Sequence, residues 1–512
     1  MTLKCLKLPV LVGMVAFTPA IVDANVSLLV EEAVGGAGEF TGSGHGAVFF
    51  STLCAESPTK LRNCKAGEEG AVISTYPELG TQSPHKWLAL PLTAFLYGVD
   101  LKTRVPLYAN GKIRKSLREA YRREHLQEVV PDSVSGVMPP GRWSEMLAGV
   151  INRDIYALTV TTTPEQDAKL LKDLEGLRNV KDFSATYNNC ADFARDVLNL
   201  IFPKATHRDV LNDFTMTTPK AIARSFTAYA TKRPELNFHI TKYSQIDGAI
   251  RRSLNNRNFT EKAIVSKKYF LTMAFTKPEL LPIMGATYLI TGWYNLDPQY
   301  KKYAGQEVAA LNSKAQRLKN QRWILNFVYA GPSGVTLKEL DRRKDDHRRE
   351  FFGTDKTWGD YQKRFDPIMT KAVNNGLFLD RAEIQTFFKD LELQSEPAFD
   401  GRGELVLKVN DRGHQETLGL TNENILNPNS SRRLAHKLML AKVNAILHAP
   451  SRNRPSLPEF ENTWQLLLAS GVDVPMYEFA AGDRTKAPRF RQVQEVVSTK
   501  KKSQKLLMTI TH

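Results

Sequence analysis

Two residues of this 512-residue chain have the side chains and local context for nucleophilic chemistry on a carbonyl group. The first is Cys190, which follows Asn189 at the start of CADFARDVLNLIF, a stretch whose apolar residues recur with helical periodicity. Asn189 is a typical N-cap, so Cys190 would lie in the first helical turn. Unpaired N–H groups and the helix dipole stabilise negative charge there, which predicts a lowered thiol pKa and donors for an oxyanion.

The second residue is His45, the candidate general base for the thiol. It lies between Gly44 and Gly46 in GSGHGAVFF, at the beginning of a short β-type run. Glycine neighbours allow a substrate and a facing helix to approach closely. Taken singly, each residue is weak evidence for function: the favoured interpretation of His45 is then a surface histidine at a strand edge, and that of Cys190 an inert core thiol.

The chain has four cysteines, and their spacing sets Cys190 apart. Cys54 and Cys64 flank the turn-forming stretch AESPTKLRN, which predicts a hairpin disulfide if the compartment is oxidising. Closing that loop would stabilise the fold by about 2–3 kcal/mol. The alternative is two free buried thiols. Since Cys5 lies in a leader-like segment, the pairing would leave Cys190 as the unpaired cysteine.

Residues 1–24 have the form of a secretory signal peptide. Lys4 and Lys7 precede an apolar run over residues 8–17, and small side chains stand at the sites before a cleavage after Ala24. The alternative is a buried N-terminal helix. We therefore expect export to the periplasm or secretion. A second apolar stretch, residues 280–294, is shorter than the roughly 18 residues that a spanning helix needs, so it predicts a buried helix.

The formal net charge of +16 favours anionic partners. For an exported protein these would be envelope lipids, lipoproteins or peptidoglycan, with peripheral contact to an anionic membrane surface. Nucleic acid is not expected, because no nucleic-acid motif is present. No cofactor or metal site is expected either. A hydrophobic content of 42% is ordinary for a globular protein and argues against a largely disordered chain.

The first half of the chain mixes strand and helix signals, which predicts an α+β fold. Thr163 is the predicted N-cap of a helix that begins at Pro164 and runs to about Gly176. Residues 112–128 are highly charged and also predict a helix. Short runs rich in β-type residues occupy 47–50, 71–75 and 155–162.

The chain changes character after Pro203, where long amphipathic stretches such as 314–330 and 358–376 predict a mainly helical region. Within it, residues 404–410 and 414–420 predict a β-hairpin, and residues 431–448 a further helix. The predicted domains are a signal peptide (1–24), a catalytic domain (25–204), a mainly helical region (205–482) and a basic, partly disordered tail (483–512).

Three short motifs resemble a known family: GHGAVFF, the segment WLALPL at residues 87–92, and YNNCADFARDVL. His45 precedes Cys190 by 145 residues, the reverse of the usual papain-like order, which resembles the circularly permuted NlpC-like thiol hydrolases and acyltransferases. Residues 38–203 are most similar to the periplasmic domain of the Lnb-type lipoprotein N-acyltransferases. The resemblance covers about a third of the chain. It implies a permuted papain-like fold for the N-terminal domain.

This sequence departs from the family pattern in two places. The loop from Cys54 to Cys64 is inserted between the first two strands, and the expected position of the third triad member holds Ser74 or Thr75. The orienting group is therefore open. Glu31 lies upstream, as does Glu32, but a solvated face is the favoured interpretation of that pair.

The resemblance implies that Cys190 forms a thioester with an acyl group while His45 takes and returns the proton. Tyr187 would add a hydrogen bond to the oxyanion. The expected function is a periplasmic cysteine-dependent acyltransferase or hydrolase that acts on lipid or lipoprotein acyl groups or on cell-wall peptides. The rival is a noncatalytic envelope-binding or assembly protein, in which residues 205–512 carry the function and the thiol domain is vestigial.

Overall fold

The computed structural model describes most of the chain up to residue 304 and a second part from residue 381. The described residues are 24–34, 43–79, 85–133, 138–139, 141–176, 179–180, 183–184, 186–213, 216–304, 359, 381–411, 413–450, 454–455 and 457–469. The expected signal peptide (apart from Ala24), the basic tail at 483–512, and the amphipathic stretches 314–330 and 358–376 (apart from residue 359) lie outside them.

A six-stranded antiparallel sheet forms the centre of the described fold, with the order β6-β5-β2-β1-β7-β8. The runs expected at 47–50, 71–75 and 155–162 are confirmed as three of its strands. The other three were not predicted. The strands are β1 (Asn25–Glu31), β2 (His45–Phe50), β5 (Ala71–Ser74), β6 (Leu88–Pro91), β7 (Ile155–Thr161) and β8 (His239–Tyr243).

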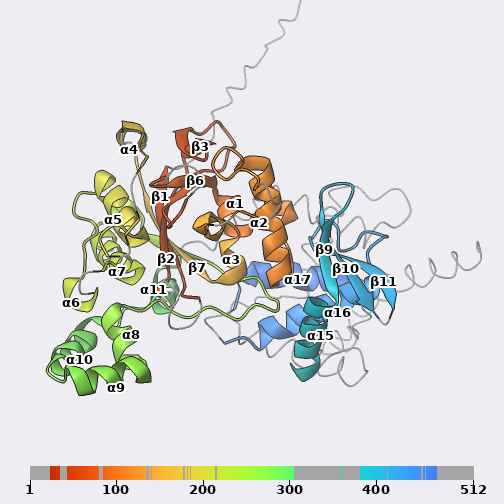
Figure 1. Cartoon of the computed structure of the whole chain (residues 1–512). Helices are drawn as coiled ribbons and strands as arrows, with labels where there is room; N and C mark the ends of the chain where they lie inside the picture. The colour runs from red at the N-terminus through yellow and green to blue at the C-terminus, as the bar shows by residue number, and fades with distance from the viewer. Residues whose placement is uncertain are drawn as a thin grey trace, which may run out of the picture.

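Helices cover both faces of this sheet, so its strands are buried on both sides (Figure 1). Leu29 and Ala47 point into the core under one helical layer, and their neighbours Val30 and Val48 point into the other. The first layer contains α1 (Leu92–Tyr97), α2 (Gly111–His125) and α3 (Gly149–Asn152). The second contains α4 (Pro164–Gly176), α5 (Cys190–Ile201), α7 (Pro219–Ala230) and α11 (Leu296–Tyr303). Together, helices and antiparallel sheets confirm the α+β class.

The helix starts expected from capping residues are confirmed. Helix α5 begins at Cys190, and the Asn189 side chain accepts hydrogen bonds from the Ala191 and Asp192 N–H groups at 2.9 and 3.0 Å. Thr163 Oγ1 accepts from the Gln166 N–H group at 3.3 Å at the start of α4. These contacts satisfy donors that the first helical turn leaves without intrahelical partners.

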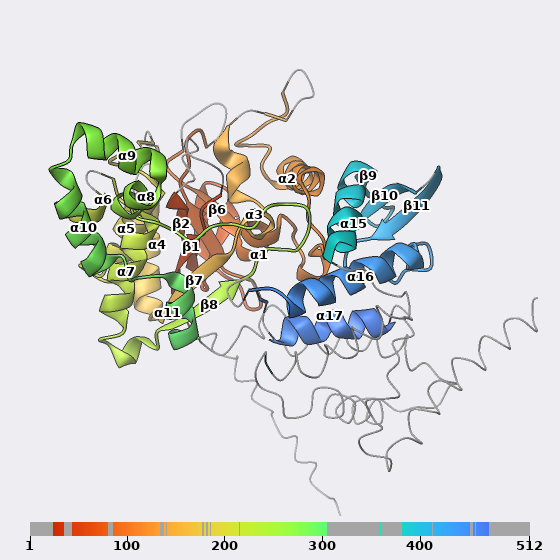
Figure 2. The ribbon, with the colours of Figure 1, turned by 90° about the horizontal axis from the view of Figure 1, so that it is seen from below.

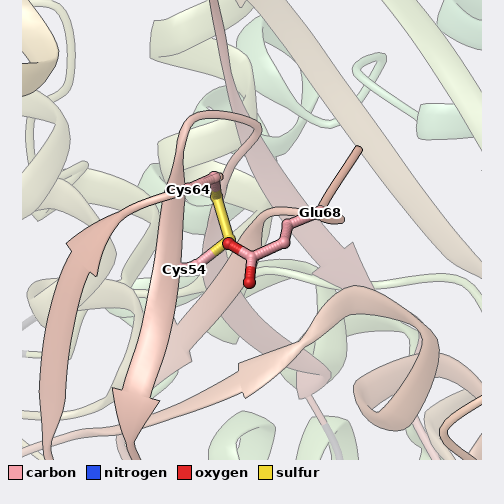
Figure 3. Close-up of side chains that lie close together, drawn as sticks. All are labelled: Cys54, Cys64 and Glu68. Carbon is pink, nitrogen blue, oxygen red and sulfur yellow. A yellow bond between two sulfur atoms is a disulfide. The ribbon is translucent and has the colours of Figure 1, made fainter. Parts of the chain in front are cut away.

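The predicted disulfide is present and closes a hairpin. Cys54 lies in β3 (Leu53–Ser57), and Cys64 follows β4 (Lys60–Asn63), the strand that pairs with it. Figure 3 shows the bonded sulfurs with Glu68 beside them. Because the bond closes a local turn, the cysteine spacing together with the expected export was enough to predict it.

The boundary expected after residue 204 falls inside the chain that builds the central sheet. Strand β8, at 239–243, pairs with β7, and α7 packs against β1 and β7. One short helix, α6 (Val210–Asp213), follows α5 in the chain. Three helices come after β8: α8 (Phe259–Val265), α9 (Lys267–Thr276) and α10 (Leu280–Thr291). The sheet therefore depends on residues on both sides of position 204.

The prediction that residues 280–294 form a buried helix is wrong in its burial. Helix α10 forms there, but Ile283, Leu289 and Trp293 are 59%, 65% and 77% exposed. Sequence alone could not show this, because burial of an apolar helix depends on how many neighbours surround it. Within the part of the chain that the structure describes, no helix is both long and apolar enough to cross a membrane.

The second described part mixes helices and strands, so the expectation of a mainly helical region is only partly met. The predicted hairpin is confirmed and gains a third strand, and the helix predicted at 431–448 is also confirmed. The elements are α15 (Arg381–Leu393), β9 (Ser395–Phe399), β10 (Leu405–Asp411), β11 (His414–Gly419), α16 (Arg432–Leu447) and α17 (Leu457–Ala469).

This part packs on the α1–α2 layer, on the opposite side of the sheet from α5 and α8–α10 (Figure 2). Hydrogen bonds of backbone and side-chain groups connect this second part to the segment around Leu107. The Leu107 N–H group donates to the Leu420 carbonyl at 2.7 Å, and Lys442 Nζ donates to the Leu107 carbonyl at 2.8 Å. The contact shares one hydrophobic core with the sheet.

Candidate active site

The candidate site lies where β2 and β5 stop pairing. Their register pairs are Val48 with Ile73, Phe49 with Val72, and Phe50 with Ala71, so the preceding residues of β2 have an open edge toward β5. The N–H and C=O of one strand residue point to the same side of the strand. Gly46 therefore offers both of its backbone groups to this gap, and its carbonyl accepts a hydrogen bond there from Ser74 Oγ at 3.2 Å.

Cys190 reaches the same gap from helix α5, which crosses β2 at Gly46. A Cβ atom at position 46 would lie 3.7 Å from the Cys190 carbonyl oxygen and 3.8 Å from Ala191 Cα. A side chain longer than a methyl group would thus displace the helix. The Gly46 backbone is close enough to the Cys190 sulfur to favour its thiolate form. The sulfur is consequently held beside the residue that follows His45.

His45 and Ser74 are directly linked. The distance from His45 Nε2 to Ser74 Oγ is 2.6 Å, and the Ser74 hydroxyl donates a hydrogen bond to the Gly46 carbonyl. A hydroxyl has one proton to donate, so Ser74 accepts from Nε2–H. This chain of hydrogen bonds selects the tautomer with the proton on Nε2 and leaves Nδ1 with a free lone pair, able to accept a proton.

The surroundings of His45 keep it neutral. Its side chain is 4% exposed and stacks on Tyr76, with ring centroids 3.8 Å apart and an interplanar angle of 14°. Burial lowers the pKa of His45 well below its usual value, and the positive charge of Arg153 lowers it further. A neutral imidazole is the form that can act as a general base.

The expectation of a lowered thiol pKa at Cys190 is wrong. Burial raises the pKa of this thiol to about 11, and the negative charge of Glu31 adds to the rise, whereas the Gly46 and Ala191 backbone groups oppose it. The helix start opposes this rise only in part, because the Asn189 side chain accepts from the Ala191 and Asp192 N–H groups. The Asp192 carboxylate in the first turn also raises the pKa.

The interpretation of Glu31 and Glu32 as a solvated face is also wrong, since both are buried. Glu31 is the register partner of His45 across β1 and β2, so their side chains share one face of the sheet. Glu31 Oε2 lies 3.0 Å from Arg153 Nη1, and burial raises the pKa of the Glu31 carboxyl to about 7. Glu32 Oε2 accepts from Ser253 Oγ at 2.6 Å.

Arg153 and Tyr76 are site neighbours that the sequence reasoning missed. Arg153 is fully buried and lies 3.2 Å from Glu145, so its guanidinium group pairs with the carboxylates of both Glu31 and Glu145. Two sequence patterns could have pointed to them. Tyr76 is two residues beyond Ser74, which places both on the same face of an extended chain. Arg153 lies two residues before Ile155, the first residue of the apolar strand β7.

The side chains of Ser74 and Thr75 point to opposite faces of the sheet. Adjacent residues of an extended chain point to opposite faces, and of the two it is Ser74 that meets His45. Tyr187 lies near Cys190 in sequence but is 67% exposed, and its backbone groups bond with Ser184 and Arg208. This position gives no support to the expectation that its hydroxyl binds an oxyanion.

Two clusters among the described residues have the side-chain types of a metal site, but neither suits one. In the first, the Cys54 and Cys64 sulfurs are bonded to each other, and Glu68 pairs with Arg62 at 2.6 Å. The second comprises exposed surface residues, in which His125 Nε2 already lies 2.8 Å from Asp100.

Comparison with known proteins does not supply a function. No protein-family model, curated protein or solved structure matches this chain. The arrangement of Cys190, His45 and Ser74 must therefore be interpreted from its own chemistry.

Proposed function

We propose that this protein is a cysteine-dependent acyltransferase or hydrolase. In this proposal Cys190 is the nucleophile, His45 is the general base, and Ser74 orients the imidazole. The observation that carries it is the hydrogen-bond chain from His45 Nε2 through Ser74 to the Gly46 carbonyl, in the gap that also receives the Cys190 sulfur. A nucleophile, a base and a third group that holds the base are the parts of an activated nucleophile.

The fold context supports the same proposal. A cysteine at a helix start, packed against a strand that begins with histidine, is the arrangement that the resemblance to permuted papain-like enzymes implies. We choose Ser74 as the third member, which the sequence left open between two residues, because it lies on the strand next to that histidine and hydrogen bonds to it.

The reaction begins from two neutral groups. Because the pKa of Cys190 is raised to about 11 and that of His45 is lowered, the site holds a thiol and a neutral imidazole at pH 7. Proton transfer from Sγ to Nδ1 then accompanies attack on the carbonyl carbon rather than preceding it. The imidazolium formed keeps its Nε2–H bond to Ser74.

The acyl group is then transferred in two balanced steps. Sulfur forms a thioester as the bond from the acyl carbon to the leaving oxygen or nitrogen breaks, and His45 returns its proton to that leaving atom. In the second step water or an amine attacks the thioester, gives a proton to His45, and expels the sulfur, which regains the proton. We assign the backbone N–H of Cys190 to the oxyanion, because Asn189 already accepts from the next two N–H groups.

The substrate class follows from where we infer the protein works. The leader-like N-terminus and the disulfide support export to an oxidising compartment such as the periplasm. Acyl groups of envelope lipids or lipoproteins and the peptide bonds of peptidoglycan are the carbonyl substrates available there. The net charge of +16 suits anionic forms of each.

One observation favours the noncatalytic alternative. A raised thiol pKa is also the property of an inert buried cysteine, so the Cys190 environment alone is compatible with an envelope-binding protein that carries a vestigial site. The two functions differ in whether a covalent acyl adduct ever forms.

The decisive experiment looks for that adduct. The chain without residues 1–24 is incubated with a water-soluble short-chain activated ester, with labelled envelope lipids and with wall peptides, and the peptide that contains Cys190 is weighed by mass spectrometry. We expect an acyl adduct on the wild-type protein, and none on Cys190→Ala or His45→Ala. Absence of an adduct with every donor, in a folded protein, would replace this proposal with the binding function.

A further inference from the structure

We propose that helices α9 and α10 dock on the surface of an anionic phospholipid bilayer. This inference rests on the proposed function and deepens it, because it names the lipid–water interface as the place where the enzyme meets its acyl substrate. The surface concerned, which we call the α9–α10 patch, consists of Phe270, Leu271, Phe275, Ile283, Leu289 and Trp293.

Exposed apolar side chains are concentrated in this segment. Of the sixteen large hydrophobic residues that are exposed among those described, eight lie between Phe259 and Trp293. Phe275 and Trp293 are the most exposed of all sixteen, at 84% and 77%. Scattered exposed hydrophobics are normal on a protein surface, but a concentration of this kind marks an interaction site.

The outward face of α10 is apolar along its length. Residues 282, 286 and 289 of α10 recur every three or four positions and are exposed, as is Trp293 just beyond the end of the helix, whereas Met284 and Thr287 are buried. Helix α9 repeats this pattern with Leu271 and Phe275. A helix that is hydrophobic nearly all round is normally covered on every side, so the outward face is suited to a second apolar environment.

Basic residues accompany the patch and identify that environment as anionic lipid. The segment 257–293 has five basic residues and two acidic ones. One of the acids, Glu261, already pairs with the buried Lys220 at 2.6 Å. Lys267 at the start of α9 and Lys277 directly after its end are both exposed, so a lysine lies at each end of the helix that carries Leu271 and Phe275. Aromatic and aliphatic side chains with adjacent lysines are the composition by which peripheral helices enter the headgroup region of anionic membranes.

The patch is joined to the layer that carries Cys190. Thr260 Oγ1 donates to the Asn212 carbonyl at 2.9 Å, and the Phe259 N–H group donates to Asp213 Oδ1 at 3.4 Å, so α8 is fixed to α6. Asp213 in turn accepts from Thr218, the N-cap of α7, which packs against α5. Figures 1 and 2 show α8–α10 at the end of the molecule on the α5 side of the sheet.

The test measures binding of the full mature chain to vesicles by sedimentation. Wild-type protein should pellet with vesicles of phosphatidylcholine and phosphatidylglycerol, and at least about tenfold less with phosphatidylcholine alone, because each basic group near an anionic surface contributes about 1 kcal/mol. The triple variant Phe275→Ser, Leu289→Ser, Trp293→Ser should lose most of this binding. The matched control, Leu101→Ser, Leu393→Ser, Phe399→Ser, removes exposed hydrophobics elsewhere and should bind as wild type does.

Two further variants keep the inference falsifiable if the triple variant misfolds. Lys267→Glu combined with Lys277→Glu should weaken binding while leaving the apolar residues intact. Trp293→Phe should remove much of the fluorescence quenching that brominated lipids cause in the wild-type protein. Equal binding by the patch and control variants would overturn the inference. So would a wild-type dimer that the triple variant converts to a monomer without any binding to vesicles, since the patch would then join two copies of the chain.

The outcomes also separate this inference from the proposed enzyme activity. Cys190→Ala should still pellet with anionic vesicles. The patch variant should still form the Cys190 adduct with a water-soluble ester and should lose adduct formation only with vesicle-borne donors. Vesicle binding without any adduct would retain the docking surface and reject the enzyme.

Discussion

His45 Nε2 and Ser74 Oγ lie 2.6 Å apart, and this contact decides which nitrogen of the imidazole carries the proton. Because the Ser74 hydroxyl donates its one hydrogen to the Gly46 carbonyl, His45 Nε2 must donate to Ser74, and Nδ1 is the imidazole nitrogen without a proton. The backbone of the same residue, Gly46, is close enough to the Cys190 sulfur to favour its thiolate form. One glycine thus ties the proposed nucleophile to the group that orients its base.

Ser74→Ala should lower the rate of acyl transfer without unfolding the protein. The change removes the acceptor for Nε2–H, so the imidazole is no longer held in one tautomer, and part of the roughly 10²–10⁴-fold contribution of a general base is lost. Thr75→Ala is the matched control, because its side chain is on the other face. The rate of adduct formation on Cys190 measures the effect, and equal rates for the two variants would contradict an orienting role for Ser74.

Alkylation of Cys190 by iodoacetamide should be slow at pH 7 and should rise roughly tenfold for each pH unit up to about pH 10. The reason is that the thiol has its pKa raised to about 11, and only the thiolate reacts. Cys54 and Cys64 are protected by their disulfide, so one cysteine is labelled in a chain that lacks residues 1–24. A plateau in the labelling rate between pH 5 and 8 would instead reveal a resting thiolate, as the sequence suggested.

Glu31→Gln should reduce the dependence of folding stability on pH. The carboxyl has a folded pKa of about 7, raised by burial above its usual 4.5, so the folded state holds its proton more tightly than the unfolded state. Its favourable contribution is complete below about pH 4.5 and is lost as the pH rises through 7. The rise in pKa from 4.5 to about 7 corresponds to a loss of unfolding free energy of roughly 3 kcal/mol at most across this pH range.

Urea unfolding at several pH values measures this effect. Between pH 4.5 and 7 the free energy of unfolding of the wild type should fall relative to that of Glu31→Gln. Glu56→Gln, at an exposed carboxylate, is the control. Parallel curves for wild type and Glu31→Gln across this range would show that Glu31 is not protonated in the folded protein.

Mass spectrometry without reduction should recover the peptides around Cys54 and Cys64 as one linked species. Reduction should lower the free energy of unfolding by about 2–3 kcal/mol, as expected for closing a short loop. A Cys54→Ala, Cys64→Ala variant should match the reduced protein. Recovery of both residues as free thiols from the exported protein would refute the bond.

Local features of this chain were determined by the sequence itself. The start of α5 at Cys190, the start of α4 at Pro164 and the hairpin from β10 to β11 follow from caps, periodicity and turn residues a few positions apart. The Cys54–Cys64 bond belongs with them, because it closes a turn of ten residues. In each case the interacting groups are close in sequence, so their spacing already limits their geometry.

Burial was decided by the tertiary structure. Strand β1 has no alternation to reveal it, because helices cover both faces of the sheet and both sets of its side chains are apolar. Glu31 and Glu32 were misjudged for the same reason, since nothing near them in sequence indicates Arg153 or Ser253. Helix α10 shows the converse case, an apolar stretch that the fold leaves partly uncovered.

The proposed site also has features that the sequence indicated and features that only the tertiary structure decided. Residue types and local motifs singled out Cys190 and His45, but the choice of Ser74 over Thr75 required knowledge of which face of β5 looks toward β2. The protonation of Cys190 depended on more distant parts of the chain, because its pKa reflects the atoms that desolvate it and the charge on Glu31. Sequence spacing sets which groups can meet within one element. Desolvation and charge pairing arise only when separate elements pack together, and here they determine whether the thiol holds its proton.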